Sequence, residues 1–202
     1  MPRRPSIRSQ RTAPITTATL ALTAFALIAA LDEPSTLDLA AYDWAARNYH
    51  RALVLAQRPI EFVGLPGIYI PLALLLARQL KRKRRRGGRS ITNAAIGGWL
   101  VLRVSRMFIH RPRPPRPPGR GPKSESTFPS GHTTGVTALS IVLARVLRDE
   151  RILTSRQAAL VGYGWPIVTA LNRVYVREHW VTDVIAGGLL GTSAGSAVLS
   201  LR

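Results

Sequence analysis

The chain contains no cysteine, and it has few acidic residues and few aromatic side chains. The absence of cysteine excludes disulfides and thiolate metal sites, so the sequence carries no information on redox compartment. Only 10 Asp and Glu stand against 29 Lys and Arg, which gives a formal net charge of +19 over 202 residues. So few acids leave no obvious carboxylate cluster for Mg²⁺ or Ca²⁺. We therefore expect no metal and no other cofactor.

Apolar residues are abundant, at 46%, and they form long runs between blocks of basic residues. A span needs roughly 20 mostly apolar residues to cross about 30 Å of hydrocarbon. Six stretches qualify or nearly so, and nothing indicates a second core. We therefore predict an all-α, integral-membrane bundle of six transmembrane helices over residues 14–202, after a basic cytoplasmic tail, residues 1–13. The predicted spans are residues 14–31, 60–77, 91–109, 133–147, 157–171 and 184–199.

The segments between these stretches alternate in charge, which predicts their orientation. One side carries both termini, the run KRKRRR at residues 81–86 and a basic loop at residues 148–156. The positive-inside rule places this side in the cytoplasm. The run at 81–86 is first a topology anchor, second a site for anionic lipid head groups and only third a nucleic-acid site. The first apolar run is also open to interpretation as a signal peptide, but no cleavage site leads into a soluble domain.

Two further patterns predict structure rather than chemistry. Residues 32–59 mix apolar side chains with charges such as Asp38, which indicates a helix lying at the membrane interface. Trp44 in this segment is of the type that settles at head-group level, and His50 is interpreted as a surface histidine. In the last predicted span, glycines recur every four residues, so one helix face lets a neighbour approach closely. These glycines are Gly187, Gly191 and Gly195.

Two arginines, Arg103 and Arg106, lie in the third predicted span and share a helix face. An arginine at membrane depth costs at least ~2.5 kcal/mol on insertion scales, so it normally faces a cavity or a partner, or it snorkels to the interface. Arg113 follows in an Arg-Pro-Arg-Pro sequence, where proline stops the helix. Guanidinium groups make forked hydrogen bonds to phosphate, so this cluster offers phosphate donors.

A second cluster, Phe-Pro-Ser-Gly-His, precedes the fourth predicted span at residues 128–132. The free amides of a starting helix form an anion site. Ser130 adds a hydroxyl donor beside the Gly131 amide, and His132 stands where a proton can be given to a leaving oxygen. A lone Ser-Gly-His tripeptide is weak evidence, and its place on the same predicted membrane face as Arg113 strengthens it.

The third cluster lies between the last two predicted spans. Arg173 is at the exit of the fifth span, and His179 and Asp183 are at the entry of the sixth. The i,i+4 spacing puts the Asp183 carboxylate one turn from His179, where it can hold one ring nitrogen and leave the other free to attack. Taken alone, these two residues could be a structural His–Asp pair. Three clusters on one side of one bundle favour a nucleophile.

The first two clusters resemble motifs of the type 2 phosphatidic acid phosphatase superfamily, which includes bacterial phosphatidylglycerophosphate and undecaprenyl-pyrophosphate phosphatases. The first motif of that superfamily is a lysine, six residues and Arg-Pro. Here Arg106 stands in the lysine position and Arg113 begins the Arg-Pro pair. The second motif, Pro-Ser-Gly-His, is intact at residues 129–132.

The third cluster resembles the remaining motif of this superfamily, which is Ser-Arg, five residues, His, three residues and Asp. It matches Arg173, His179 and Asp183, with Asn172 in place of the serine. The resemblance covers residues 106–183. Arg for Lys at position 106 keeps the charge but changes the shape of the phosphate donor, and Asn172 is the milder departure.

The resemblance implies a membrane-bound, metal-independent phosphatase that hydrolyses a lipid phosphate or lipid pyrophosphate monoester through a phosphohistidine. It implies His179 as nucleophile, Asp183 as its orienting carboxylate and His132 as acid and base. The phosphate-binding set would be Arg106, Arg113, Ser130, Gly131 and Arg173. The expected location is a bacterial cell membrane, with both termini cytoplasmic and the active site extracytoplasmic. The expected partners are a lipid phosphate and membrane lipids, not nucleic acid.

Three rival classes share some of these features. A vanadium-dependent haloperoxidase would use a similar oxyanion pocket, but such enzymes are larger and soluble. A catalytically silent lipid-binding or scrambling protein of the same fold would have no need of the intact His132, His179 and Asp183. A basic nucleic-acid binder would leave membranes with salt alone. The identity of the lipid and the oligomeric state stay open.

Overall fold

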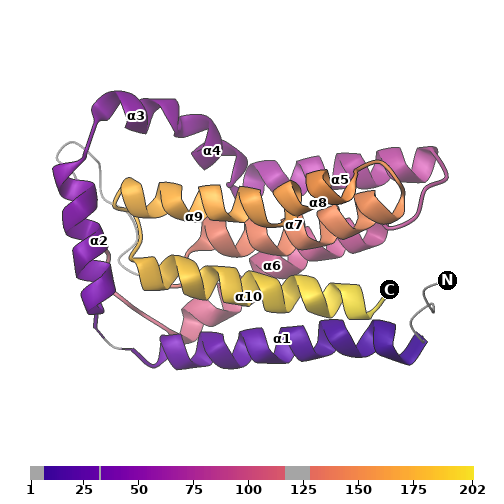
Figure 1. The fold of residues 1–202 in the computed structure, drawn as a ribbon, viewed down its shortest axis with the longest axis horizontal. Coiled ribbons are helices and arrows are strands. Elements are labelled where there is room, and N and C mark those ends of the chain that lie inside the picture. Colours follow the sequence, from indigo (N-terminus) through magenta and orange to yellow (C-terminus); the bar gives the residue numbers. More distant parts are fainter. Residues whose placement is uncertain (1–6, 32, 117–127) are drawn as a thin grey trace.

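The computed structural model describes residues 7–31, 33–116 and 128–202 (Figure 1). These residues form helices and no strand, as the all-α prediction requires. Residues 1–6 of the predicted tail and part of the proline-rich segment, at 117–127, lie outside the described residues. The helices are α1 (Ile7–Ala29), α2 (Thr36–Arg47), α3 (Arg51–Ala56), α4 (Arg58–Val63), α5 (Pro66–Arg82), α6 (Gly88–Phe108), α7 (Gly131–Asp149), α8 (Ser155–Ala159), the π-helical turn η1 (Leu160–Gly164), α9 (Trp165–Tyr175) and α10 (Val181–Ser200).

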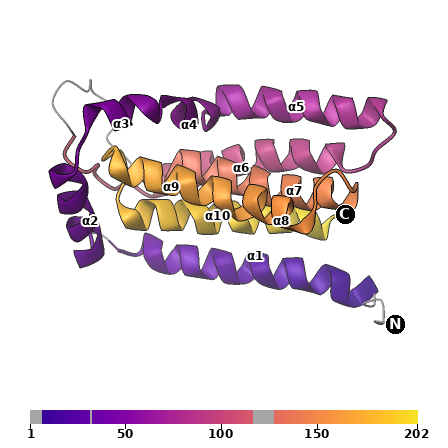
Figure 2. The same cartoon turned by 45° about the horizontal axis from the view of Figure 1, so that its top comes forward.

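The long helices run side by side along the long axis of the molecule (Figures 1 and 2). They are α1, α5, α6, α7, the continuous run α8–η1–α9, and α10, and they correspond in order to the six predicted apolar stretches. Large apolar side chains such as Leu27, Met107 and Leu171 are exposed on the outside of this bundle. α2 lies across one end of it, whereas the C-terminal end of α10 and the start of α1 lie at the other (Figures 1 and 2).

The length and hydropathy of single helices give a smaller number of membrane spans than six. Among the described residues, only α10 is long and apolar enough to cross a membrane, and the bent pair 51–63 and 66–82 qualifies if it is counted as one span. The buried face of α7 carries hydroxyls, among them Thr134, Thr137 and Ser140, which lower its hydropathy while they face the protein interior. The six-span arrangement therefore stays a prediction.

The glycine face of α10 packs against α7, as its spacing predicts. A Cβ on Gly191 would stand 2.5 Å from the carbonyl oxygen of Thr134, and one on Gly187 would stand 2.7 Å from that of Ser130. Side chains at these positions would force the two helices apart. The same close approach brings the start of α7 against the start of α10, where the backbone N–H of Ser130 donates to the carbonyl of Asp183 at 3.0 Å.

The second predicted stretch, residues 60–77, is not one continuous helix. α4 ends at Val63, and α5 starts at Pro66 with a bend of 51° between the two. Leu65 precedes the proline and takes an extended backbone, with φ −75° and ψ 136°, as a residue before proline prefers. This break turns α4 toward the end of the bundle and brings Glu61 to the residues discussed below.

The segment at 32–59 forms α2 and α3 and the start of α4, and one of its charges is not on the surface. Asp38 is 1% exposed, so it does not belong to a solvated face. It closes the capping box that starts α2: its carboxylate accepts from the backbone N–H of Ser35, whose hydroxyl accepts from the Asp38 N–H. His50 is exposed, as predicted, and Trp44 is exposed as well.

Candidate active site

A cavity of about 210 Å³ opens at the end of the bundle where α5, α7 and α10 begin and α6 and α9 end. Six of the eight predicted site residues line it, and these come from all three sequence clusters. The remaining two, Ser130 and Asp183, are fully buried directly behind the lining. The lining residues are Pro66, Leu102, Arg106, Arg113, Gly131, His132, Arg173, Glu178 and His179.

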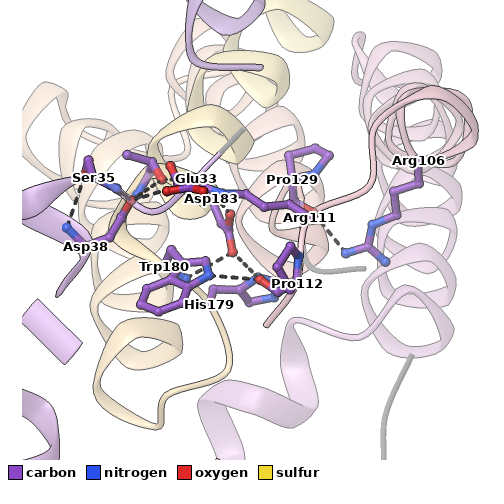
Figure 3. Close-up of polar contacts among 11 residues, drawn as sticks. Glu33, Ser35, Asp38, Arg106, Arg111, Pro112, Pro129, His179, Trp180 and Asp183 are labelled. Atoms are coloured by element: carbon purple, nitrogen blue, oxygen red, sulfur yellow. Dashed lines mark hydrogen bonds and ion pairs between the residues drawn. The ribbon is translucent and has the colours of Figure 1, made fainter. Parts of the chain in front are cut away.

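His179 lies in the turn between α9 and α10, and Asp183 lies in the first turn of α10. The Nδ1 of His179 is 3.4 Å from Oδ2 of Asp183, and both side chains are buried (Figure 3). The same Oδ2 accepts from the backbone N–H of Trp180 at 3.0 Å, which closes the start of α10. Because Asp183 holds Nδ1, Nε2 is the ring nitrogen left for chemistry at the cavity.

The protonation state of His179 follows from its surroundings. Burial lowers its pKa, and the hydrogen bond and charge of Asp183 oppose this, while Arg113 and Arg173 lower it further. The net direction is downward from the ordinary value of 6.5, so the imidazole is neutral at neutral pH. A neutral, carboxylate-oriented imidazole has the lone pair that a nucleophile needs.

The backbone turn that delivers His179 depends on Arg177. This residue has a positive φ of 55°, which reverses the chain after α9, and the N–H groups of Glu178 and His179 both return to the carbonyl of Arg173. The Arg177 guanidinium lies over the rings of Tyr42 and Tyr49, at 5.7 and 5.3 Å from their centroids. The aromatic residues of α2 and its following turn therefore stabilise the turn that carries the histidine.

Arg106 and Arg113 reach the cavity from the end of α6 and the segment after it. Nη2 of Arg106 donates to the carbonyl of Pro129 at 2.9 Å, and its buried Nε has no hydrogen-bond partner among the described residues (Figure 3). Nη1 of Arg113 donates to the carbonyl of Glu178 at 2.9 Å. Burial lowers the pKa of Arg113, and the Glu178 carboxylate partly offsets this. Arg103, by contrast, is exposed on α6 and lies outside the cavity lining.

Arg173, at the end of α9, is held by the residue before it. The side-chain oxygen of Asn172 accepts from Nε and Nη2 of Arg173 at 3.1 and 2.6 Å, and the Asn172 amide donates to Gln57 at 2.6 Å. A planar guanidinium bound on two nitrogens keeps one orientation. Asn172 thus fixes the direction of Arg173. From the sequence alone, Asn172 was interpreted only as the milder departure from the motif.

The start of α7 contributes Gly131 and His132. A Cβ on Gly131 would stand 2.9 Å from Leu102 and 3.4 Å from Nη2 of Arg106, so only glycine fits against α6 without a shift. Nε2 of His132 is 3.1 Å from the carbonyl oxygen of Glu61, to which it donates. The Ser130 hydroxyl accepts from Thr133 at 3.0 Å behind the lining.

Two carboxylates near the cavity were absent from the sequence-based site. Glu61 of α4 pairs with Arg173 at 3.2 Å, and Glu178 pairs with Arg113 at 3.6 Å and with Arg116 at 2.7 Å. Glu178 stands beside the predicted nucleophile in sequence, and that adjacency was the signal available for it. Glu61 gave no signal, because only the break between α4 and α5 brings it to Arg173.

The fold and the site together define a class, which is a helical bundle with an arginine-lined cavity at one end. The structure matches the crystal structure of a transmembrane PAP2 type phosphatidylglycerolphosphate phosphatase from Bacillus subtilis, with a TM-score of 0.79 and 22% identity over 90% of this chain and 94% of that one. Residues 87–202, more than half of the chain, match the model of the PAP2 superfamily. The chain therefore belongs to the PAP2 superfamily, which confirms the family predicted from its three motifs.

Curated relatives are phosphatases that act on polyprenyl lipids. The chain is 28% identical to decaprenylphosphoryl-5-phosphoribose phosphatase of Mycobacterium tuberculosis over 140 residues, which cover 66% of this chain and 71% of that protein. It is 26% identical to undecaprenyl-diphosphatase of Sulfolobus acidocaldarius over 141 residues, or 64% of this chain and 61% of that one. A shorter match, 34% over 67 residues, covers 31% of this chain and 28% of undecaprenyl-diphosphatase BcrC of Bacillus subtilis.

Proposed function

We propose that this chain is a membrane-bound phosphatase that hydrolyses a lipid phosphate or lipid pyrophosphate monoester through a phosphohistidine. The family and the curated relatives support the broader class, a membrane lipid phosphatase. One observation supports the proposed phosphohistidine mechanism. Residues from three separate motifs line one cavity, in which the buried Asp183 lies behind His179.

The first half of the reaction transfers the phosphoryl group to the enzyme. The guanidinium groups of Arg106, Arg113 and Arg173 and the amides at the start of α7 bind the phosphoryl oxygens and offset their charge in the transition state. Nε2 of His179 attacks phosphorus in line, while Asp183 accepts the hydrogen bond from Nδ1. The bond from phosphorus to the leaving oxygen breaks, and the imidazolium form of His132 gives that oxygen a proton and becomes neutral.

The second half returns the enzyme to its starting state. His132, now without its proton, takes one from a water molecule as that water attacks the phosphorus of the phosphohistidine. The bond between phosphorus and Nε2 breaks, so inorganic phosphate leaves and His179 is again neutral. In this scheme the arginines carry out the charge stabilisation that a metal ion performs in other phosphatases. Within residues 7–31, 33–116 and 128–202, no group of three or more His, Asp or Glu is placed to hold a metal.

The two ends of the bundle support a proposal for the orientation in the membrane. The cavity lies where α5 begins, and the basic run 81–86 lies where α5 ends, on the side that holds the end of α10 (Figure 1). If the basic end faces the cytoplasm, the cavity opens at the outer face of a bacterial cell membrane. We propose six spans, with the substrate entering from the surrounding lipid and its phosphate at the head-group level.

A phosphate-release screen on the purified protein in nanodiscs tests this function. Four substrates are compared, namely a polyprenyl pyrophosphate, phosphatidylglycerophosphate, phosphatidate and a prenyl-linked sugar phosphate. We expect hydrolysis of at least one that is inhibited by vanadate and unaffected by EDTA, and an acid-labile phosphoenzyme that forms in the wild type and not in His179→Ala. A folded protein that binds these lipids without releasing phosphate would instead identify a silent lipid-binding or scrambling protein.

A further inference from the structure

We propose that Arg111 and Asp38 are positioning residues that orient Asp183 and, through it, the nucleophile His179. This inference rests on the proposed phosphatase function and goes beyond its motifs, because neither residue stands at a defined position of the three motifs. Asp38 lies on α2, far from the other residues in sequence, and Arg111 lies two residues before the phosphate-binding Arg113.

The Arg111 guanidinium lies between two buried carboxylates. Its Nη1 is 3.3 Å from Oδ1 of Asp183, and its Nη2 is 3.2 Å from Oδ2 of Asp38 (Figure 3). Nη1 also donates to the hydroxyl of Thr182, and Nη2 donates to the carbonyl of Glu33 at 2.8 Å. Arg111 is 3% exposed and is not part of the cavity lining, so its contacts separate it from the arginines around the phosphate.

Asp38 holds the other side of this network. Its Oδ1 accepts from the Thr182 N–H and its Oδ2 from the Thr182 hydroxyl, both at 2.8 Å. Ser35 adds two more donors to Oδ2, from its N–H and its hydroxyl, at 2.9 and 3.0 Å. Burial raises the pKa of Asp38, but the hydrogen bonds from Thr182 and Ser35 outweigh this and lower it, so the carboxylate is an anion. A buried anion at this position holds the Arg111 cation in place.

The two oxygens of Asp183 have different partners. Oδ1 faces Arg111, whereas Oδ2 faces Nδ1 of His179 and the N–H of Trp180. A carboxylate bound at both oxygens cannot rotate. The Asp183 carboxylate can only accept from Nδ1, which fixes the proton there and leaves the lone pair on Nε2. Partners behind an orienting group commonly set the geometry of the group in front.

The network also links two distant parts of the chain. α2 lies across the end of the bundle, and its contact with α10 runs through Asp38 and Thr182, which are 144 residues apart. Docking of α2 therefore determines whether Arg111 and Asp183 meet at the correct distance. The sequence motif provides His179 and Asp183, and the network provides their alignment.

The test separates catalysis from phosphate binding in the full-length protein in nanodiscs. Three variants are compared: Asp38→Asn, which keeps the shape and removes the charge, Arg111→Met and Arg111→Lys. We expect kcat to fall about 10- to 100-fold in Asp38→Asn and further in Arg111→Met, as for partners behind an orienting ligand. Arg111→Lys should recover part of the Arg111→Met loss. The inhibition constant of inorganic phosphate, which needs the cavity arginines but no attack by His179, should change less than about 3-fold in all three.

Two controls make the outcome decisive. The exposed pair at the other end of the bundle supplies a matched charge removal, Asp149→Asn, which should leave kcat unchanged. Thr182→Val, which removes hydroxyl contacts to Asp38 and Arg111 without removing a charge, should lower kcat and replaces Arg111→Met if that variant does not fold.

The inference fails if folded Asp38→Asn and Thr182→Val keep the wild-type kcat. It also fails if the affinity for inorganic phosphate falls in step with kcat, because Arg111 would then be a phosphate ligand. Failure of the proposed function is distinguishable, because the wild-type protein would then release no phosphate from any of the four substrates.

Discussion

Charged side chains at the two ends of the bundle differ in burial and in the way they are paired. At the cavity end, Asp38, Arg111 and Asp183 are at most 3% exposed, and each has several partners. At the opposite end, the Arg145–Asp149 pair is 59% and 38% exposed, with Arg202 as a second partner of Asp149. Both sets of side chains form ion pairs, but only the set at the cavity end is buried.

This difference predicts where single substitutions matter. A buried ion that loses its partner keeps the cost of desolvation without the attraction, so its removal affects the whole network. An exposed pair is screened by solvent and contributes roughly 0–1 kcal/mol. The predictions that follow would break or sharpen this contrast, and they run from the largest expected effect to the smallest.

The largest effect is expected for Asp183→Asn at the cavity end. The amide can present its N–H₂ to His179 and favour the wrong tautomer, so kcat should fall by about 10³- to 10⁴-fold, as for other carboxylates that orient a catalytic histidine. Phosphate release and phosphoenzyme trapping both report the loss. Activity within 10-fold of the wild type would mean that His179 does not depend on Asp183 for its orientation.

The next effect is expected for Arg173→Lys, where the charge is kept and the planar fork is lost. A lysine cannot donate to Asn172 and Glu61 in the same geometry and still face the phosphate. We expect kcat/KM to fall by about 10²-fold, within the range for removal of one donor to a charged transition state. Steady-state kinetics with the preferred substrate measure it, and an unchanged kcat/KM would show that charge alone is enough.

A smaller loss is expected for Asn172→Ala. Arg173 keeps its charge and its contact with Glu61 but loses two hydrogen bonds that set its direction. We expect KM to rise and kcat/KM to fall by about 10-fold, the cost of roughly one net charged hydrogen bond. A loss as large as that of Arg173→Lys would indicate that Asn172 contacts the substrate itself.

The pH dependence of phosphate release tests how the buried charges at the cavity end act on His179. The proposed nucleophile, His179, must be neutral to attack, and burial first, then Arg113 and Arg173, lowers its pKa below 6.5, against the opposing effect of Asp183. Protonation of His179 should therefore reduce kcat/KM only below pH 6.5, where activity declines as pH falls through the lowered pKa. Residual activity in Asp183→Asn should decline at still lower pH, since a contribution that raises the pKa has been removed. An acid limb above 6.5 would contradict this assignment.

The smallest effect is expected for Asp149→Asn at the opposite end. Two exposed ion pairs are lost, yet kcat should not change and the free energy of unfolding should fall by less than about 1 kcal/mol. Thermal unfolding in detergent and phosphate release measure the two quantities on one sample. A loss of activity here would break the contrast between the two ends.

Much of the site was predictable because its residues occur in motifs of fixed spacing. Helix starts and ends placed Arg106, His132 and Arg173 at one end of the bundle before any tertiary contact was known, and the i,i+4 spacing paired His179 with Asp183. The glycines of α10 predicted its close packing against a neighbour, because a helix face without side chains lets another helix approach. The π-helical turn η1 and the break before Pro66 were not expected, although the proline marks the second.

Glu61, Asp38 and Arg111 were not predictable in their actual places. Asp38 has the sequence surroundings of a charge on an amphipathic helix, and the same surroundings fit a solvated face. Its burial depends on where α2 docks, and that depends on contacts with residues more than a hundred positions away. Local patterns report the period of a helix and the chemistry of a side chain, but not the partner that a charge meets across the bundle.

The sequence by itself determined the family, the helical class and the candidate site residues, because these depend on local spacing and residue type. The tertiary structure alone decided how those side chains are held. It placed Glu178 against Arg113, Asn172 against Arg173, and the Asp38–Arg111 pair behind Asp183. The physical reason is that a buried charge must find its partner wherever the packed helices bring one, and helix packing is a property of the whole chain.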